Sequence, residues 1–161
     1  MRGGALPPAL LCAALGIALG FGPRRLFAPS LAMFVAAAFA ASLLRAPTSW
    51  DDAVFLGCWV SLIIAAGSVH LPPTARRRWG MMMAANAGLW TGAVIAVSGS
   101  RLDLFVALPW ALLCIPVGMI VARKRGIIVK VIASWLMAVG ILAASLQMAP
   151  TTPGYRPDHM D

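Results

Sequence analysis

Charged residues are scarce in this sequence, and acidic residues are the scarcest. Only 11% of the 161 residues are charged, the five acidic residues are all Asp, and 61% of the residues are hydrophobic. A soluble domain carries about 25% charged residues. The mean hydropathy of +0.87 agrees with the low charge. The composition therefore excludes a soluble enzyme, a large extramembrane domain and a nucleic-acid-binding module.

Long apolar stretches occupy most of the chain instead. A helix that crosses a membrane needs about 20 mostly apolar residues, and the first stretch is near the lower limit. Apolar residues run continuously within each stretch, which excludes transmembrane β-strands because these alternate apolar and polar residues. Short connections rich in Pro, Gly and Arg separate the stretches, so consecutive helices are expected to be antiparallel neighbours. The stretches are 5–22, 26–44, 53–71, 80–99, 103–121 and 127–147.

The sequence thus predicts an all-α integral membrane bundle of about six transmembrane helices in three antiparallel hairpins. Residues 1–149 form one predicted domain, since no connection is long enough to be an interdomain linker. Residues 150–161 contain three Pro and a Gly, which predicts an exposed extended or disordered tail. The first stretch follows Arg2, as a signal peptide would. The absence of an Ala-x-Ala site, and Pro23-Arg24-Arg25 just beyond the stretch, favour a retained helix instead.

Basic residues are sorted between the two ends of the predicted bundle. Nine of the thirteen Lys and Arg residues, including Lys130, lie at one end, whereas the other four and all five Asp lie at the opposite end. Because Lys and Arg are retained on the cytoplasmic side, the nine-residue end is predicted to be cytoplasmic in an inner membrane, with both termini periplasmic. The residues predicted to set this topology and to contact anionic lipid are Arg24, Arg25, Arg76, Arg77, Arg78, Arg123, Lys124 and Arg125.

Small residues recur at intervals of four in several stretches. Such spacing lets a second helix backbone approach closely, so that dispersion contacts hold the two helices together. We predict that these contacts lie within the bundle, and the alternative is an interface between copies of the chain. The predicted packing residues are Gly16, Gly20, Ala84, Gly88, Gly92 and Ala96, with a similar series at Ala32, Ala36 and Ala40.

Polar groups inside the stretches are few. No ionisable residue lies near the middle of a predicted span, which disfavours proton-coupled pumps and intramembrane hydrolases. Asn86 is the most polar candidate, and a hydrogen bond between helices is favoured over a role in a solute pathway. Pro109 and Pro116 each remove a backbone donor from the fifth stretch, which favours a packed, kinked helix over a broken helix lining a cavity. The other polar positions are Ser61, Ser68 and Thr91.

Known motifs of catalysis and metal binding are missing. The three Cys residues are isolated within stretches, which is typical of buried small hydrophobic residues. Met81–Met83 and the residues around His159 fall at opposite ends of the predicted bundle and cannot form one soft-metal site. No nucleotide fingerprint or hydrolase motif is present. We therefore expect no catalytic residue, no metal and no cofactor.

Two functional hypotheses follow. The leading one is a small inner-membrane transporter, permease or channel-like bundle that binds a small solute. Its pathway would run between the kinked fifth stretch and the polar positions of the third and fourth. The alternative is a non-catalytic accessory, assembly or anchoring subunit of a larger membrane complex. The expected partners are the lipid bilayer and either a second copy or a membrane complex, with no nucleic acid.

Overall fold

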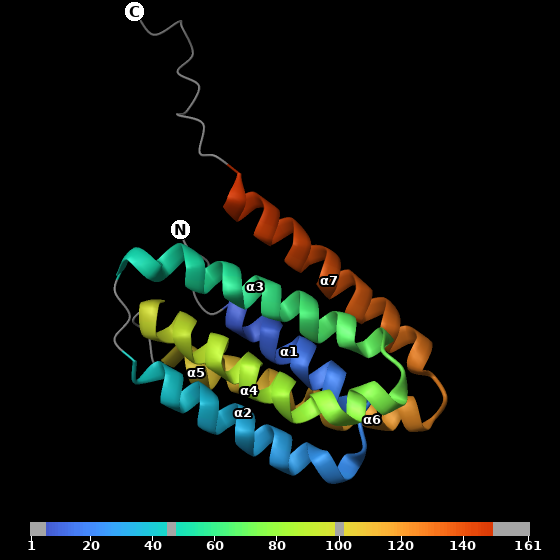
Figure 1. The fold of residues 1–161 in the computed structure, drawn as a ribbon. Helices are drawn as coiled ribbons and strands as arrows, with labels where there is room; N and C mark the ends of the chain where they lie inside the picture. Colours follow the sequence, from blue (N-terminus) through green and yellow to red (C-terminus); the bar gives the residue numbers. More distant parts are fainter. Residues whose placement is uncertain (1–5, 45–47, 99–101, 150–161) are drawn as a thin grey trace, which may run out of the picture.

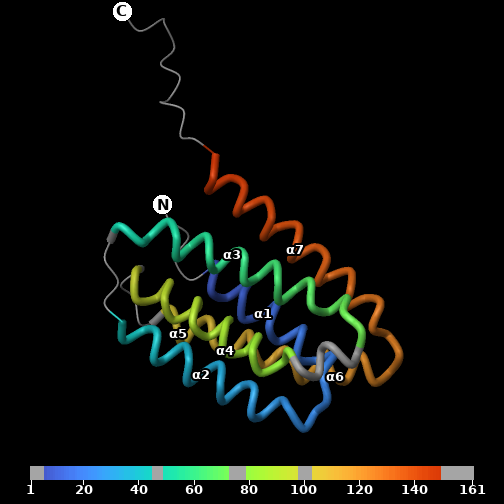
Figure 2. The backbone as a smooth tube through the Cα atoms, in the orientation of Figure 1, coloured from blue at the N-terminus to red at the C-terminus, as the bar shows by residue number. Residues whose placement is uncertain are grey.

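The structure is a computed structural model that describes residues 6–44, 48–98 and 102–149. Every regular element in these ranges is helical, which confirms the predicted all-α class (Figures 1 and 2). The predicted tail, residues 150–161, lies outside the described part. The α-helices are α1 (Leu6–Gly20), α2 (Phe27–Ser42), α3 (Asp51–Gly67), α4 (Pro73–Ser98), α5 (Leu102–Ala107), α6 (Cys114–Ala122) and α7 (Gly126–Met148). The 3₁₀ segments are η1 (Arg24–Leu26), η2 (Thr48–Trp50), η3 (Ser68–His70) and η4 (Leu108–Leu113).

Several of these helices are long and apolar enough to cross a membrane, which suggests a membrane protein. Five segments meet this description within the described residues, and α1, at 15 residues, is a shorter apolar helix. The five are Arg24–Ser42, Asp51–His70, Trp79–Val97, Asp103–Ala122 and Gly126–Met148.

The start of α4 differs from the sequence prediction. The apolar stretch predicted from residue 80 agrees with the apolar segment Trp79–Val97, whereas the helix α4 itself begins earlier, at Pro73, and is 26 residues long. Proline suits the first helical position because its missing N–H would have no helical partner there. Arg76, Arg77 and Arg78 therefore lie on the helical backbone of α4 and not in a loop. The described residues do not include their side chains.

The short helix α1 lies at the centre of the bundle (Figures 1 and 2). Eleven of its fifteen residues are buried, and it packs on α3, α4, η4 and α6. Leu11, Ala14 and Leu15 are fully buried and belong to the main hydrophobic core. α1 corresponds to the first apolar stretch, which was near the lower length limit for a span. This helix nevertheless supplies the surface on which the others pack.

Helices that are consecutive in the chain are not the closest neighbours. Consecutive spans run in opposite directions (Figure 1), but α2 packs most extensively on α4, and α1 packs on η4 and α6. α7 packs mainly on α3. Of the predicted antiparallel hairpins, α3 and α4 do pack on each other, whereas α1 and α2 have few contacts. A short connection fixes the direction of the next helix, whereas the fit of its surface decides which helix it lies against.

The fifth span is divided into α5, η4 and α6. Pro109 stands at the start of the 3₁₀ segment η4, where its missing N–H removes a bond that a continuous α-helix would need. The tighter 3₁₀ turns close hydrogen bonds over three residues instead of four. The sequence predicted one kinked helix here, whereas the structure has two α-helical pieces joined by a 3₁₀ segment. Ala111 in this segment is buried, so the break is packed against the bundle.

Candidate functional site

The closest helix pair is α2 with α4, and glycines make the contact. Gly88 lies against the backbone of Phe34 and Ala38, and Gly92 lies against Ala38 and Ala41. Residue numbers rise together along the two helices, so the pair is parallel. A Cβ atom on Gly92 would overlap the carbonyl oxygen of Ala38. Two of the predicted packing glycines thus lie in a contact within one chain.

A second parallel pair joins α1 to the fifth span. A Cβ on Gly16 would lie 2.8 Å from the Ala111 oxygen, and a Cβ on Gly20 would lie 2.7 Å from Val117 Cβ. Because Gly16 has no side chain, the η4 backbone approaches α1 directly, and Cα–H groups can contact its carbonyl oxygens. The two glycines therefore hold the broken span against the central helix.

The other small residues predicted to pack between helices differ in their burial. Ala84 is buried, and Ala96 is half-buried beside a groove described below. Ala32, Ala36 and Ala40 are exposed, so the series predicted for α2 lies on the wrong face. The packed face carries Ala38 and Ala41 instead. Alanine fills so many positions of α2 that spacing alone does not distinguish one face from another.

The predicted polar residues pair across helices. Asn86 Nδ2 in α4 donates a hydrogen bond to Ser61 Oγ in α3 at 2.5 Å, as the favoured sequence interpretation had it. Thr91 Oγ1 lies 3.9 Å from Cys12 Sγ of α1. Ser68 Oγ in η3 donates to the Ala65 oxygen of α3, three residues earlier, at 2.6 Å. These polar atoms are therefore occupied by protein partners.

The prolines and the polar residues of the predicted pathway lie in different parts of the bundle. Asn86 and Ser61 face one another between α4 and α3, whereas the segment that carries Pro109 packs on α1. The Pro109 side chain is exposed and Pro116 is half-buried. The prolines and the polar positions thus belong to different helix interfaces. The described residues do not bring the prolines and the polar positions together, and the expected solute route between them stays a prediction.

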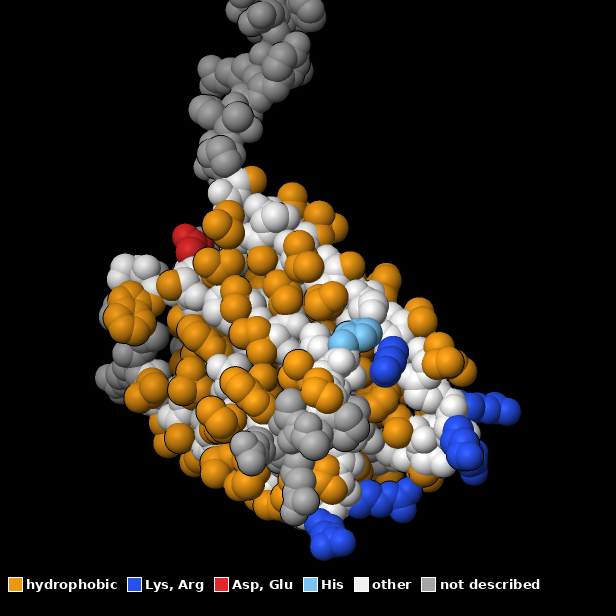
Figure 3. Space-filling model, turned by 45° about the vertical axis from the view of Figure 1, so that its right-hand side comes forward, with side chains coloured by type: hydrophobic (Ala, Val, Ile, Leu, Met, Phe, Trp, Pro, Cys, Tyr) orange, Lys and Arg blue, Asp and Glu red, His pale blue; other side chains and the backbone are white. Residues whose placement is uncertain are grey.

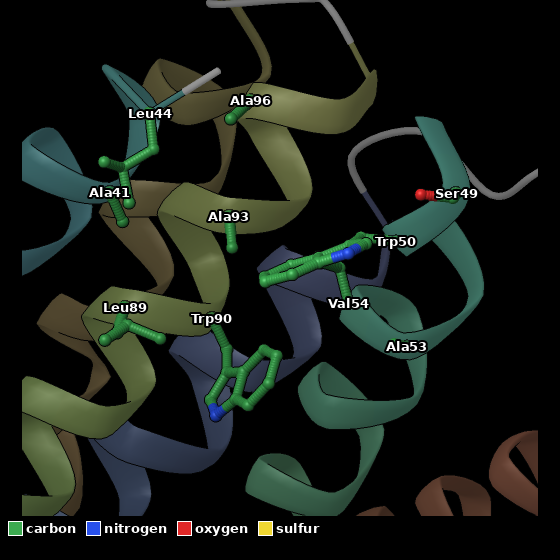
Figure 4. A pocket seen from close by; sticks show the side chains of 10 residues that line it. All are labelled: Ala41, Leu44, Ser49, Trp50, Ala53, Val54, Leu89, Trp90, Ala93 and Ala96. Atoms are coloured by element: carbon green, nitrogen blue, oxygen red, sulfur yellow. The ribbon is translucent and has the colours of Figure 1, made fainter. Parts of the chain in front are cut away.

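A groove that the sequence did not predict lies between α2 and α3. It has a volume of about 750 Å³, α4 forms its floor, and its lining is almost entirely apolar. Figure 4 shows Trp50 and Trp90 with their rings projecting into the space, beside the small side chains of Ala93 and Ala96. The remaining lining residues are Ala41, Leu44, Ser49, Ala53, Val54 and Leu89.

Small residues next to bulky ones create this groove. Trp90 contacts α3 where Gly57 leaves space for the ring, and the alanines one and two turns later on α4 leave the region above the ring unfilled. The sequence predicted Ala96 as a packing residue and did not indicate that it lines a groove. The sequence feature that could have predicted the groove is the series Trp90, Ala93 and Ala96, which places one large and two small side chains along one side of α4.

The ends of the bundle differ in charge. The described loop cations Arg24, Arg25, Arg123, Lys124 and Arg125 lie in η1 and in the turn between α6 and α7. On the face seen in Figure 3, basic side chains gather at one end and an acidic side chain marks the other. Lys124 adopts a left-handed conformation with φ of 59°, which lets the Arg125 and Lys124 N–H groups bond the last carbonyls of α6.

Comparison of this chain with known protein families, with curated proteins and with solved structures gives no match. The functional argument therefore depends on the geometry of the described residues.

Proposed function

We propose that the protein is a small integral membrane protein that binds a lipophilic solute in the groove between α2 and α3. The observation that carries this proposal is the groove itself, with its volume of about 750 Å³ and its apolar lining. Ligand pockets in proteins have volumes of about 300–1,000 Å³. A transporter or solute-binding bundle is therefore favoured over a purely structural protein.

The chemistry of the groove selects the ligand class. Its lining is apolar apart from Ser49, Trp50 and Trp90, and each of these side chains carries at most one hydrogen-bond donor. A polar solute would lose its hydration without gaining enough partners, which costs free energy. A hydrocarbon chain or another lipophilic molecule loses nothing comparable and gains dispersion contacts with the two rings. This differs from the polar pathway expected from the sequence.

The charge distribution supports an orientation in the membrane. The basic end, with its loop cations after α1 and α6, would face the cytoplasm of an inner membrane, because Lys and Arg are retained on that side. Both chain termini would then be periplasmic, and the groove would open toward the outer half of the bilayer.

Filling the groove should prevent ligand binding. Ala93→Trp places an indole on its floor, where the present side chain is half-buried. A phosphatidylcholine carrying a photoactivatable group in its acyl chain serves as the probe, in vesicles that contain the purified protein. We expect light-induced adducts on the groove peptides of α3 and α4 in the wild type. In Ala93→Trp these adducts should fall to the level found on the outer face of α7.

The matched control is Ala138→Trp, which adds the same ring at an exposed position of α7. It should leave the labelling of the groove unchanged. Equal labelling of the groove peptides in Ala93→Trp and in the wild type would contradict the proposal. If gentle purification also recovers a stoichiometric partner, the accessory-subunit alternative is favoured.

Thiol labelling in intact cells tests the orientation. Ser49→Cys introduces a thiol at an exposed position of the acidic end, and Ala122→Cys introduces one at an exposed position of the basic end. A membrane-impermeant maleimide should label position 49 and not position 122. The unmodified protein is the control, since Cys12, Cys58 and Cys114 are all buried. Labelling of position 122 from outside would reverse the proposed topology.

A further inference from the structure

A small polar cluster lies at the seam between α3 and α7, near the basic end. The segment η3 brings His70 to α7, where its Nε2 lies 3.2 Å from Ser134 Oγ. Lys130 precedes Ser134 by four residues, so both side chains lie on the same face of α7. Figure 3 shows a basic side chain next to the histidine. An imidazole, a hydroxyl and an ammonium therefore share one patch, and His70 and Lys130 are exposed.

The cluster is rich in donors and carries positive charge. The Lys130 ammonium has three N–H donors, and the Ser134 hydroxyl can donate outward while it accepts a bond from His70 Nε2–H. The described acidic residues are Asp51 and Asp52 at the start of α3 and Asp103 at the start of α5, all at the acidic end of the bundle. His70 ends η3, about 27 Å further along the helix from Asp52. These carboxylates are too distant to neutralise the ammonium at the basic end. An anion with several acceptor oxygens, such as a phosphate group, is the complementary ligand.

The surroundings of the cluster indicate the source of the phosphate. The adjacent α7 side chains Ile127, Val131 and Trp135 are 77%, 63% and 64% exposed, and they offer an apolar surface to acyl chains. Lys130 lies about 6 Å from the start of α7, where a lysine side chain reaches the headgroup level. A freely dissolved phosphate gains nothing from this apolar surface. A phospholipid contacts the polar cluster through its phosphate and the apolar surface of α7 through its acyl chains.

We propose that Lys130 and Ser134, with the Ser134 hydroxyl held by His70, bind the phosphodiester of an anionic phospholipid whose chains lie along α7. This site is separate from the groove, which lies between α2 and α3 and near the opposite end. It also differs from the loop arginines, because it combines a charge with a hydroxyl group that His70 holds in place. The proposed function and this lipid site can therefore fail independently.

Native mass spectrometry of the full chain tests the lipid site. The protein is reconstituted in phosphatidylcholine vesicles that contain a minority of phosphatidylglycerol, and then released in a mild detergent. We expect selective retention of phosphatidylglycerol by the wild type. Lys130→Gln should weaken this retention about fivefold, because one cation near a membrane surface contributes about 1 kcal/mol. Ser134→Ala should weaken it about threefold through the lost hydrogen bond.

Two variants serve as matched controls. Lys124→Gln removes the same charge from the turn after α6, and Ser145→Ala removes a hydroxyl that bonds only the Leu142 oxygen of its own helix. Ser145→Ala should retain phosphatidylglycerol as the wild type does. Lys124→Gln removes a loop charge that itself attracts anionic lipid, so it should weaken the retention less than Lys130→Gln does. All variants should show unchanged helical circular dichroism. Equal losses in Lys124→Gln and Lys130→Gln would overturn the site, as would equal retention of phosphatidylcholine. Displacement of the lipid by inorganic phosphate would show a site for free anions and would also overturn it.

Discussion

Gly92→Leu is expected to prevent the bundle from assembling. A Cβ atom at this position overlaps the Ala38 carbonyl oxygen and lies 2.7 Å from Ala41 Cβ, before the rest of the leucine side chain is added. Backbone atoms cannot rotate away, so α2 must move off α4. Overpacking commonly destabilises by about 1–3 kcal/mol and sometimes by more. A typical protein has a free energy of unfolding of about 5–15 kcal/mol. A whole leucine in this contact should remove most of it.

Size-exclusion chromatography and thermal denaturation in detergent measure this effect. Gly92→Leu should give little monodisperse protein, and Gly92→Ala should give folded protein with a clearly lower melting temperature. Gly80→Ala is the control on the same helix, because the nearest atom to its Cβ, Leu19 Cδ2, is 3.9 Å away. Alanine favours helix over glycine by about 1 kcal/mol, so this variant should melt no lower than the wild type. A Gly92→Leu protein that elutes and melts like the wild type would contradict the close contact.

The all-helical class and the approximate spans were predictable because they follow from one-dimensional properties. Continuous apolar runs longer than about 18 residues favour helices that satisfy their own backbone hydrogen bonds. The glycine spacing at positions 88 and 92 indicated where a helix could approach closely. Which helix approaches was not predictable, because a small-residue face accepts any partner of complementary shape. The sequence therefore located one side of the α2–α4 contact and misplaced the other.

The groove could not be predicted because it results from three helices together. Trp90, Ala93 and Ala96 lie on α4, but the space beside them exists only because α2 and α3 pack on opposite sides of that helix.

The packing of the fifth span was unpredictable for the same reason, because it depends on a distant helix. Pro109 indicated a local break, whereas its packing against α1 depends on Gly16, which lies more than 90 residues earlier in the chain.

Substitution of Gly16 should release the fifth span from the central helix. A Cβ in Gly16→Ala would lie 2.8 Å from the Ala111 oxygen and 3.0 Å from the Trp110 oxygen, so the η4 backbone must shift outward. We expect a loss of about 1–3 kcal/mol of stability for Gly16→Ala, and a larger loss for Gly16→Leu. Because the contact lies just before Cys114, that thiol should become accessible before the rest of the core opens.

The native cysteines distinguish local release from general unfolding. Cys114 begins α6, whereas Cys58 lies on α3, and both are fully buried. In Gly16→Ala, maleimide should modify Cys114 faster than in the wild type while Cys58 remains protected. Gly67→Ala is the control, since its Cβ would meet only Met137 Sδ at an ordinary 3.6 Å. If Cys114 in Gly16→Ala stays as protected as in the wild type, Gly16 is not what holds the broken span in place.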